Sequence, residues 1–153
     1  MRSSGLRSSR STVPAVLVDA GALIALLDRS DALHARCLEA LATIREPLVT
    51  VWPALTEAMH LLGGVPRGQD ALYEMVEDGA VGLVDLGADD LERMQALMEK
   101  YRDLPMDFAD AALVRVAERD GLSRILTFDR HFFIYRLPRR GRFAVLTSPN
   151  SAQ

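Results

Sequence analysis

Two isolated carboxylates lie in otherwise uncharged stretches of this chain. Asp19 is the only charged residue of segment 11–27, and Glu57 is the only formally charged residue of segment 47–66. A carboxylate in apolar surroundings needs a partner that stabilises its charge, such as a hydrogen-bond donor or a cation. Both positions are therefore candidates for a functional site, and a partly exposed helix face is the structural alternative for Glu57.

Three further acids complete the set of candidates. Asp107 and Asp110 are three residues apart, so they share one face of an expected helix. Asp129 directly follows a strand expected at 124–127 and Phe128. Each also has a structural interpretation. Asp107 and Asp129 could cap the helix that follows, as Asp19 could, and a cap contributes about 1 kcal/mol. Asp110 could occupy a first helical turn, which favours an acid.

The chemistry changes if these acids meet. Two carboxylates about 4 Å apart repel each other by about 4 kcal/mol at an effective dielectric constant of 20. Several together must take up protons or hold a cation, and the segments around Asp19 and Glu57 contain no Lys or Arg. Oxygen ligands favour Mg²⁺ or Mn²⁺. A divalent ion held by few protein ligands typically serves phosphate chemistry.

Short apolar segments that alternate with helical patterns would bring the acids together. Strands are expected at 15–18, 48–51, 81–84, 124–127 and 143–146. Helices are expected at 20–28, 31–45, 53–62, 69–77, 88–101 and 107–119. This alternation predicts an α/β fold, a three-layer α/β/α sandwich with a central, mainly parallel sheet of about five short strands. Such sheets carry their functional groups at the carboxyl ends of the strands.

Composition narrows the class of protein. The chain has 153 residues, of which 49% are hydrophobic and 25% charged, and this is typical of a single globular domain. No clean run of about 20 apolar residues is present, so no membrane association is expected. The single cysteine, Cys37, excludes an internal disulfide and a cysteine-ligated zinc site, and fits a reducing compartment. The expected parts are a flexible basic tail at 1–13, one domain at 14–148 and a C-terminal tail at 149–153.

The charges are distributed unevenly along the chain. Segment 13–123 holds nine basic and twenty acidic residues, whereas segment 124–153 holds six arginines and one acid. The acidic part would repel a polyanion unless a cation intervened, and the basic ends could bind one. The six late arginines are candidate phosphate contacts. Arg130 is the first choice among them because it adjoins Asp129.

Four segments resemble the PIN domain, and most of all the VapC-type toxins of bacterial toxin–antitoxin pairs. They are VLVDAGALIALLD with Asp19, PALTEAMHLL with Glu57, PMDFADAALVRVAE with Asp110 and ILTFDRHF with Asp129. Each segment alone is a weak signal, but the four occur in order and at the expected separations across residues 14–147. The residues before Pro14 are not part of the pattern.

The resemblance implies an α/β/α sandwich and RNA cleavage that depends on Mg²⁺ or Mn²⁺. It implies catalytic roles for Asp19, Glu57, Asp110 and Asp129, with the metal held by Asp19, Asp110 and Asp129. It also suggests accessory roles for Asp107, Thr127 and Arg130. A cytoplasmic protein with a cognate antitoxin, whose tail fills the acidic groove, is expected, and a homodimer is expected from the apolar helix stripes of a small domain.

Other functions remain open at this point. A PIN-fold nuclease of RNA processing would act without an antitoxin, and a PIN-fold binding protein would keep the fold without cleaving. Outside the family, a haloacid-dehalogenase-type phosphatase would need an acid at Gly21, two residues after Asp19. A receiver domain would need a lysine late in the chain. The only lysine of this sequence is Lys100, which falls in an expected helix.

Overall fold

A five-stranded parallel sheet forms the centre of the protein. The computed structural model describes residues 13–147. The strands of the sheet are β1 (Val16–Val18), β2 (Leu48–Val51), β3 (Val81–Val84), β4 (Arg124–Leu126) and β7 (Ala144–Val145). Their order is β3-β2-β1-β4-β7, and each neighbouring pair is parallel. The predicted parallel sheet is confirmed.

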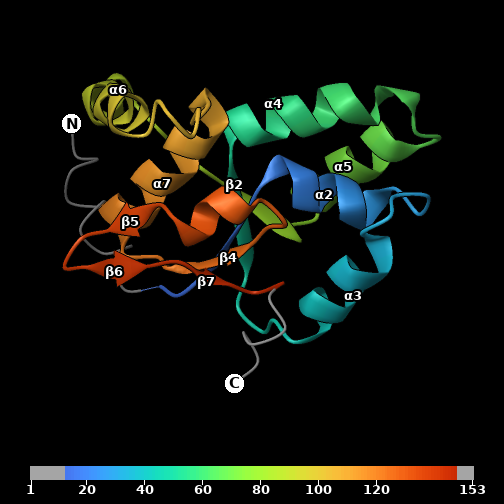
Figure 1. Cartoon of the computed structure of the whole chain (residues 1–153). Helices are drawn as coiled ribbons and strands as arrows, with labels where there is room; N and C mark the ends of the chain where they lie inside the picture. The colour runs from blue at the N-terminus through green and yellow to red at the C-terminus, as the bar shows by residue number, and fades with distance from the viewer. Residues whose placement is uncertain (1–12, 148–153) are drawn as a thin grey trace.

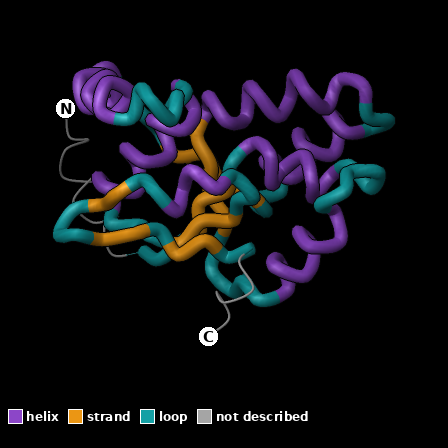
Figure 2. Tube along the Cα trace, viewed as in Figure 1, coloured by secondary structure: helices purple, strands orange, loops and turns teal. Residues whose placement is uncertain are grey.

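Helices cover both faces of this sheet (Figures 1 and 2). They are α2 (Ala20–Leu27), α3 (His34–Ala42), α4 (Trp52–Leu61), α5 (Gly68–Glu77), α6 (Leu91–Lys100) and α7 (Phe108–Asp120). Helices α2, α3 and α5 share one hydrophobic core with the sheet, and α6 and α7 share the other. Helix α4 contributes Ala54 to one core and Leu55 to the other. The predicted three-layer α/β/α sandwich is therefore confirmed.

Strand β1 is the centre of both cores. Its three residues are fully buried, with Leu17 in the core under α6 and α7, and Val16 and Val18 in the opposite core. Side chains alternate between the two faces of a strand, so an uninterrupted apolar run is what a strand covered on both sides requires. The strand ends at Val18, so the next residue, Asp19, lies at the carboxyl edge of the sheet.

The chain between β4 and β7 holds structure that the sequence patterns do not predict. It forms a 3₁₀ turn (Arg130–Phe133) and then a hairpin of two antiparallel strands, β5 (Arg136–Leu137) and β6 (Gly141–Arg142). Each strand has only two residues and one arginine, so no apolar alternation marks it. Helix α3 is also shorter than the expected helix at 31–45, because the carboxylate of Asp31 accepts the N–H of Leu33 (2.8 Å) in a turn.

The tails expected at 1–13 and 149–153 lie outside the described residues, apart from Val13. Within residues 13–147, no helix is both long and apolar enough to cross a membrane. Cys37 is fully buried in the core beside α2, where burial raises the pKa of its thiol to about 11. The thiol therefore stays protonated and belongs to the packing of this core.

Candidate active site

One pocket at the carboxyl edge of the sheet gathers all of the predicted acids. Its volume is about 360 Å³. The acids that line it are Asp19, Asp31, Glu57, Asp107, Asp110 and Asp129. None of the described residues that line it is basic. The convergence follows from topology. Strands β2 and β4 are the two parallel neighbours of β1, so all three strands end at the same edge of the sheet, where the segments after them begin.

Asp19 is the most buried of these acids, with 9% of its surface exposed. One carboxylate oxygen accepts the N–H of Ala22 (3.0 Å), so Asp19 does cap α2, and the other accepts the hydroxyl of Thr127. Burial raises the pKa of Asp19 to about 6, and the charges of Asp129 and Glu57 act in the same direction, against the two hydrogen bonds. The capping role and a role in the pocket therefore coexist.

Thr127 joins the ends of the two central strands. It is fully buried, donates its hydroxyl hydrogen to Asp19 and accepts the backbone N–H of Asp129 (2.9 Å). The carboxylate of Asp129 in turn accepts the N–H of His131 (2.9 Å), which caps the 3₁₀ turn. The structure thus places Thr127 between two predicted site residues.

Asp107 and Asp110 begin α7 as a reciprocal cap. The N–H of Asp110 donates to Asp107 (2.8 Å), and the N–H of Asp107 donates to Asp110 (3.4 Å). Burial, together with the charges of Asp107 and Asp129, raises the pKa of Asp110 to about 7, against hydrogen bonds from Asp107 and Tyr135. No Lys or Arg of segment 13–147 forms an ion pair with either acid. The charges of Asp107 and Asp110 are therefore not neutralised by an ion pair within the described part of the chain.

Glu57 lies in the second turn of α4, at the edge of the pocket. The residue is exposed, so the structural interpretation of a partly exposed helix face holds for it, yet its position also lines the pocket. Burial, and then the charge of Asp107, raise the pKa of its carboxyl.

Two residues of the site were not predicted. Asp31 lines the pocket from the turn after α2. The hydroxyl of Tyr135 donates to Asp110 (3.3 Å), and its fully buried ring packs edge-on against Tyr101 at 5.0 Å between centroids. Burial and the charge of Asp110 raise the pKa of Tyr135 above its usual range, so the phenol remains a donor. Arg130 is exposed and is not among the lining residues.

The donors of the pocket fit a hard divalent cation. They are carboxylate oxygens. The carboxyl groups of Asp19 and Asp110 have raised pKa values, and a bound cation would stabilise their charged forms. Among residues 13–147, however, no three His, Cys, Asp or Glu side chains are already arranged to hold a metal ion. Mg²⁺ is often held by only one or two carboxylates, with water completing its shell. The pocket fits that mode of binding better than an all-protein cage.

Comparison with known proteins agrees with this geometry. The sequence model of the PIN domain family matches residues 16–137, so the chain belongs to the PIN domain family. It is 33% identical over 135 residues to Ribonuclease VapC26 of Mycobacterium tuberculosis (strain ATCC 25618 / H37Rv), a match that spans 86% of this chain and 99% of that relative. The resemblance expected from the four sequence segments is confirmed.

A solved structure supports the fold independently. The crystal structure of Mycobacterium tuberculosis VapC20, described as a sarcin–ricin loop cleaving toxin, superposes with a TM-score of 0.69 at 22% sequence identity. The match covers 74% of this chain and 89% of VapC20. At this identity the comparison supports the PIN architecture and leaves the substrate of the present chain to be argued from its own residues.

Proposed function

We propose that this protein is a VapC-type endoribonuclease that hydrolyses RNA phosphodiester bonds with Mg²⁺ or Mn²⁺. The observation that carries the proposal is the meeting of Asp19, Asp110 and Asp129 in one pocket that no described basic residue lines. The extensive match to a ribonuclease of the same family supports it.

The roles follow from how each acid is held. Asp19, Asp110 and Asp129 would hold the metal directly or through water, and a bound divalent ion lowers the pKa of water and offsets charge on the phosphate. Hydrogen bonds from Thr127 and Tyr135 keep the carboxylates of Asp19 and Asp110 oriented toward the pocket. Such fixed orientation is what a metal site asks of its surrounding residues.

Glu57 is the residue that would handle the proton. It positions the attacking water and accepts its proton as general base, a role for which a raised carboxylate pKa is suited. The water oxygen forms the new bond to phosphorus while the bond from phosphorus to the 3′ oxygen breaks, and that oxygen takes up a proton. The products are a 5′-phosphate and a 3′-hydroxyl, and the 2′-hydroxyl takes no part.

The direct test is cleavage of RNA by the purified protein in Mn²⁺. Asp19→Asn and Asp110→Asn should each lower the rate by about 10³-fold or more, which corresponds to about 4 kcal/mol of transition-state stabilisation. The exposed Asp103, outside the pocket, supplies the matched control Asp103→Asn, which should cut normally.

Two results would contradict the proposal. One is normal cutting by both pocket variants. The other is a product that ends in a 2′,3′-cyclic phosphate, because that product requires the 2′-hydroxyl to attack. A substrate with a single 2′-deoxynucleotide at the cleavage position sharpens the second test, since it should still be cut.

We also propose an antitoxin partner, a homodimer and a cytoplasmic location, as the family membership suggests. A short reading frame directly upstream, whose product binds this protein and blocks cleavage, would support the antitoxin. Its absence, with cleavage intact, would favour a solitary nuclease of RNA processing. Absence of both cleavage and Mn²⁺ binding would favour an inert PIN-fold binding protein.

Light scattering of the purified chain decides the oligomeric state.

A further inference from the structure

Three arginines of the unpredicted hairpin are not engaged by the rest of the described chain. Of the six late arginines, Arg124 pairs with Glu46 (2.8 Å), and Arg136 donates to backbone carbonyls of the preceding turn (2.7 and 2.9 Å). Within hairpin 136–142, the side chains of Arg139, Arg140 and Arg142 are exposed. They form no hydrogen bond or ion pair with the described residues 13–147. The structure thus separates structural arginines from available ones.

The tip of this hairpin uses a backbone that arginine disfavours. The carbonyl of Pro138 accepts the N–H of Gly141 (3.1 Å), and φ is 61° at both Arg139 and Arg140 between them. Positive φ at both central positions is the pattern of type I′ turns, which Asn-Gly fills best, and a side chain with a Cβ is disfavoured there. Two strained residues at one exposed tip point to a use for their side chains.

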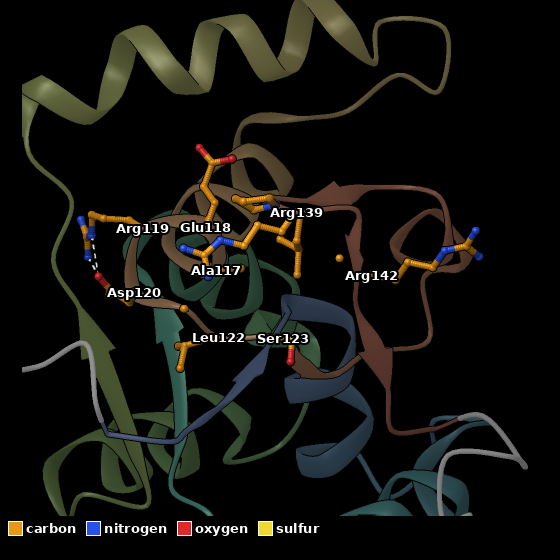
Figure 3. Close-up of a pocket in the computed structure, with 12 residues that line it drawn as sticks. Ala117, Glu118, Arg119, Asp120, Leu122, Ser123, Arg139 and Arg142 are labelled. Atoms are coloured by element: carbon orange, nitrogen blue, oxygen red, sulfur yellow. Dashed lines mark hydrogen bonds and ion pairs between the residues drawn. The ribbon is translucent and has the colours of Figure 1, made fainter.

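The hairpin also borders a cavity that is separate from the carboxylate pocket. About 420 Å³ lies between it and the C-terminal turn of α7 (Figure 3). Arg139 reaches toward Ala117 in that view, and Arg142 points to the other side. The acids of the lining are already paired, Glu118 with Arg93 (2.7 Å) and Asp120 with Arg119 (2.9 Å). The charge available to a ligand here is positive.

Helix α7 links this surface to the carboxylate pocket. Asp110 stands in its first turn, and residues of its last turn line the cavity beside the hairpin. Asp110 and the last residue of the helix, Asp120, are ten residues apart, which is about 15 Å along the helix axis.

We propose that hairpin 136–142 is a second RNA-binding site, which holds backbone phosphates of the substrate about 15 Å from the bond that is cut. This inference rests on the proposed function. The carboxylate pocket carries no basic side chain among the described residues, so without its metal ion it repels RNA. Guanidinium groups outside it can add affinity, because they bind phosphate in a bidentate manner. The strained turn holds Arg139 and Arg140 at an exposed tip, and their guanidinium groups, which have no partner in the described chain, can bind the RNA.

The test replaces the tip by the residues its backbone prefers, Arg139→Asn with Arg140→Gly. The thermal midpoint should rise by a few degrees, which excludes misfolding as the cause of any loss. The KM for a long RNA should rise on the order of tenfold at low salt while kcat stays within about twofold. In an Asp110→Asn background, the slope of log Kd against log salt should fall by about 1.5, as expected for two lost phosphate contacts.

A matched control uses another strained arginine. Arg67 also has positive φ (58°), at the start of α5, so Arg67→Gly with Arg45→Asn removes the same charge and relieves similar strain away from the hairpin. It should leave KM and the salt slope unchanged. An RNA trimmed to one nucleotide on each side of the cleavage point should be cut equally well with and without the hairpin variant, because it is too short to reach the hairpin.

Several outcomes would overturn the inference. An unchanged KM and salt slope for the long RNA, an equal effect of the control pair, or a loss confined to binding of a protein partner would each do so. If the unsubstituted protein cuts no RNA at all, it is the proposed function that fails. The two failures are therefore distinguishable.

Discussion

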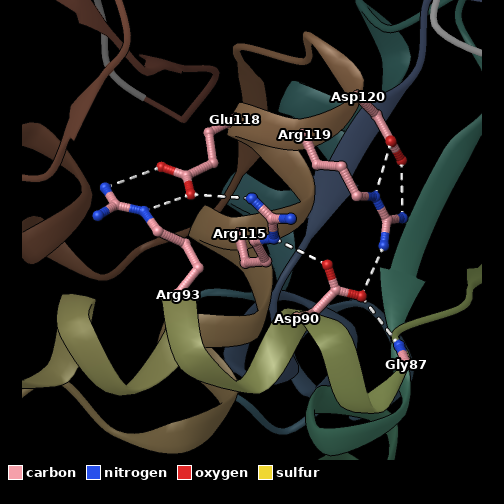
Figure 4. A network of polar contacts seen from close by, with 7 residues as sticks. All are labelled: Gly87, Asp90, Arg93, Arg115, Glu118, Arg119 and Asp120. Atoms are coloured by element: carbon pink, nitrogen blue, oxygen red, sulfur yellow. Dashed lines mark hydrogen bonds and ion pairs between the residues drawn. The ribbon is translucent and has the colours of Figure 1, made fainter.

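Two acids at opposite ends of α7, the half-buried Asp110 and the buried Asp90 that packs against the helix, are in opposite states. At its first turn, the pKa of Asp110 is raised by burial and by neighbouring carboxylates. Along its C-terminal half, Arg115 and Arg119 pair with the buried Asp90 at 2.8 and 3.1 Å, and the N–H of Gly87 adds a hydrogen bond of 2.9 Å (Figure 4). Burial alone would raise the pKa of Asp90 too, but these partners lower it below its ordinary value.

The difference shows what separates an acid with charged partners from a candidate metal ligand in this chain. Asp90 is 3% exposed and Asp19 is 9% exposed, so burial does not distinguish them. Partners do, because Asp90 has two guanidinium groups and Asp19 has a hydroxyl and an amide. Acids that burial leaves short of positive charge are the ones suited to a cation, and perturbed groups of this kind cluster at functional sites.

The largest effect on stability is expected at Asp90, the acid that two arginines neutralise. Asp90→Asn should lower the free energy of unfolding by about 3–5 kcal/mol, because Arg115 and Arg119 lose the buried carboxylate that they share, and each keeps only its more exposed partner, Glu118 or Asp120. The exposed neighbour supplies the control Asp89→Asn, which should change stability little. Denaturant unfolding measures both. Below its melting temperature, Asp90→Asn should still cut RNA, and loss of cutting by the folded variant would erase the distinction.

The second effect concerns pH, in the presence of EDTA. The pKa of Asp19 is raised in the folded protein from 3.8 to about 6, so the folded state binds the proton more tightly than the unfolded state. The resulting stability is present below pH 4 and is lost as pH rises through 6, by on the order of 3 kcal/mol. Asp110, at about 7, extends the window upward.

Variants separate the two regions in the same titration. Asp19→Asn should remove its part of the decline between pH 4 and 6, so it should be more stable than the unsubstituted protein at pH 7.5. Asp90 works in the other direction, since its lowered pKa contributes stability that is lost as pH falls into the acid range. A stability that rises from pH 4 to 7 in EDTA would contradict the account.

The smallest effect is expected at Tyr135. Tyr135→Phe removes one hydrogen bond to Asp110, which is worth about 1 kcal/mol, so the Mn²⁺ concentration for half-maximal cleavage should rise about fivefold. Tyr101→Phe is the matched control, because its hydroxyl accepts the N–H of Arg136 (3.0 Å) and donates to none of the acids that line the pocket. Equal Mn²⁺ dependence in both variants would assign Tyr135 a packing role only.

Much of the fold could be predicted because its signals are local. The uncharged runs at 15–18 and 48–51 are strands covered on both faces, and such strands need no polar alternation. The site acids stood out for the same reason, since Asp19 and Glu57 are single charges in these surroundings. Parallel topology then predicted that they meet, and the pocket bears out that part of the prediction.

The remainder depends on tertiary contacts. Tyr135 lies in the run Phe132–Tyr135, where no periodicity tells which ring faces Asp110. Asp31 follows Arg29-Ser30 and has the features of an ordinary turn residue until the turn is placed against the pocket. The hairpin escaped prediction because Arg139 and Arg140 occupy positions where Asn or Gly would be expected.

Anomalous diffraction from a crystal grown with Mn²⁺ tests the central claim most directly. We expect a manganese peak inside the pocket, bonded directly or through water to Asp19 and Asp110, and absent from crystals of Asp110→Asn. A map with manganese only outside the pocket, or with the same peak in the variant, would contradict the assignment of these acids to the metal.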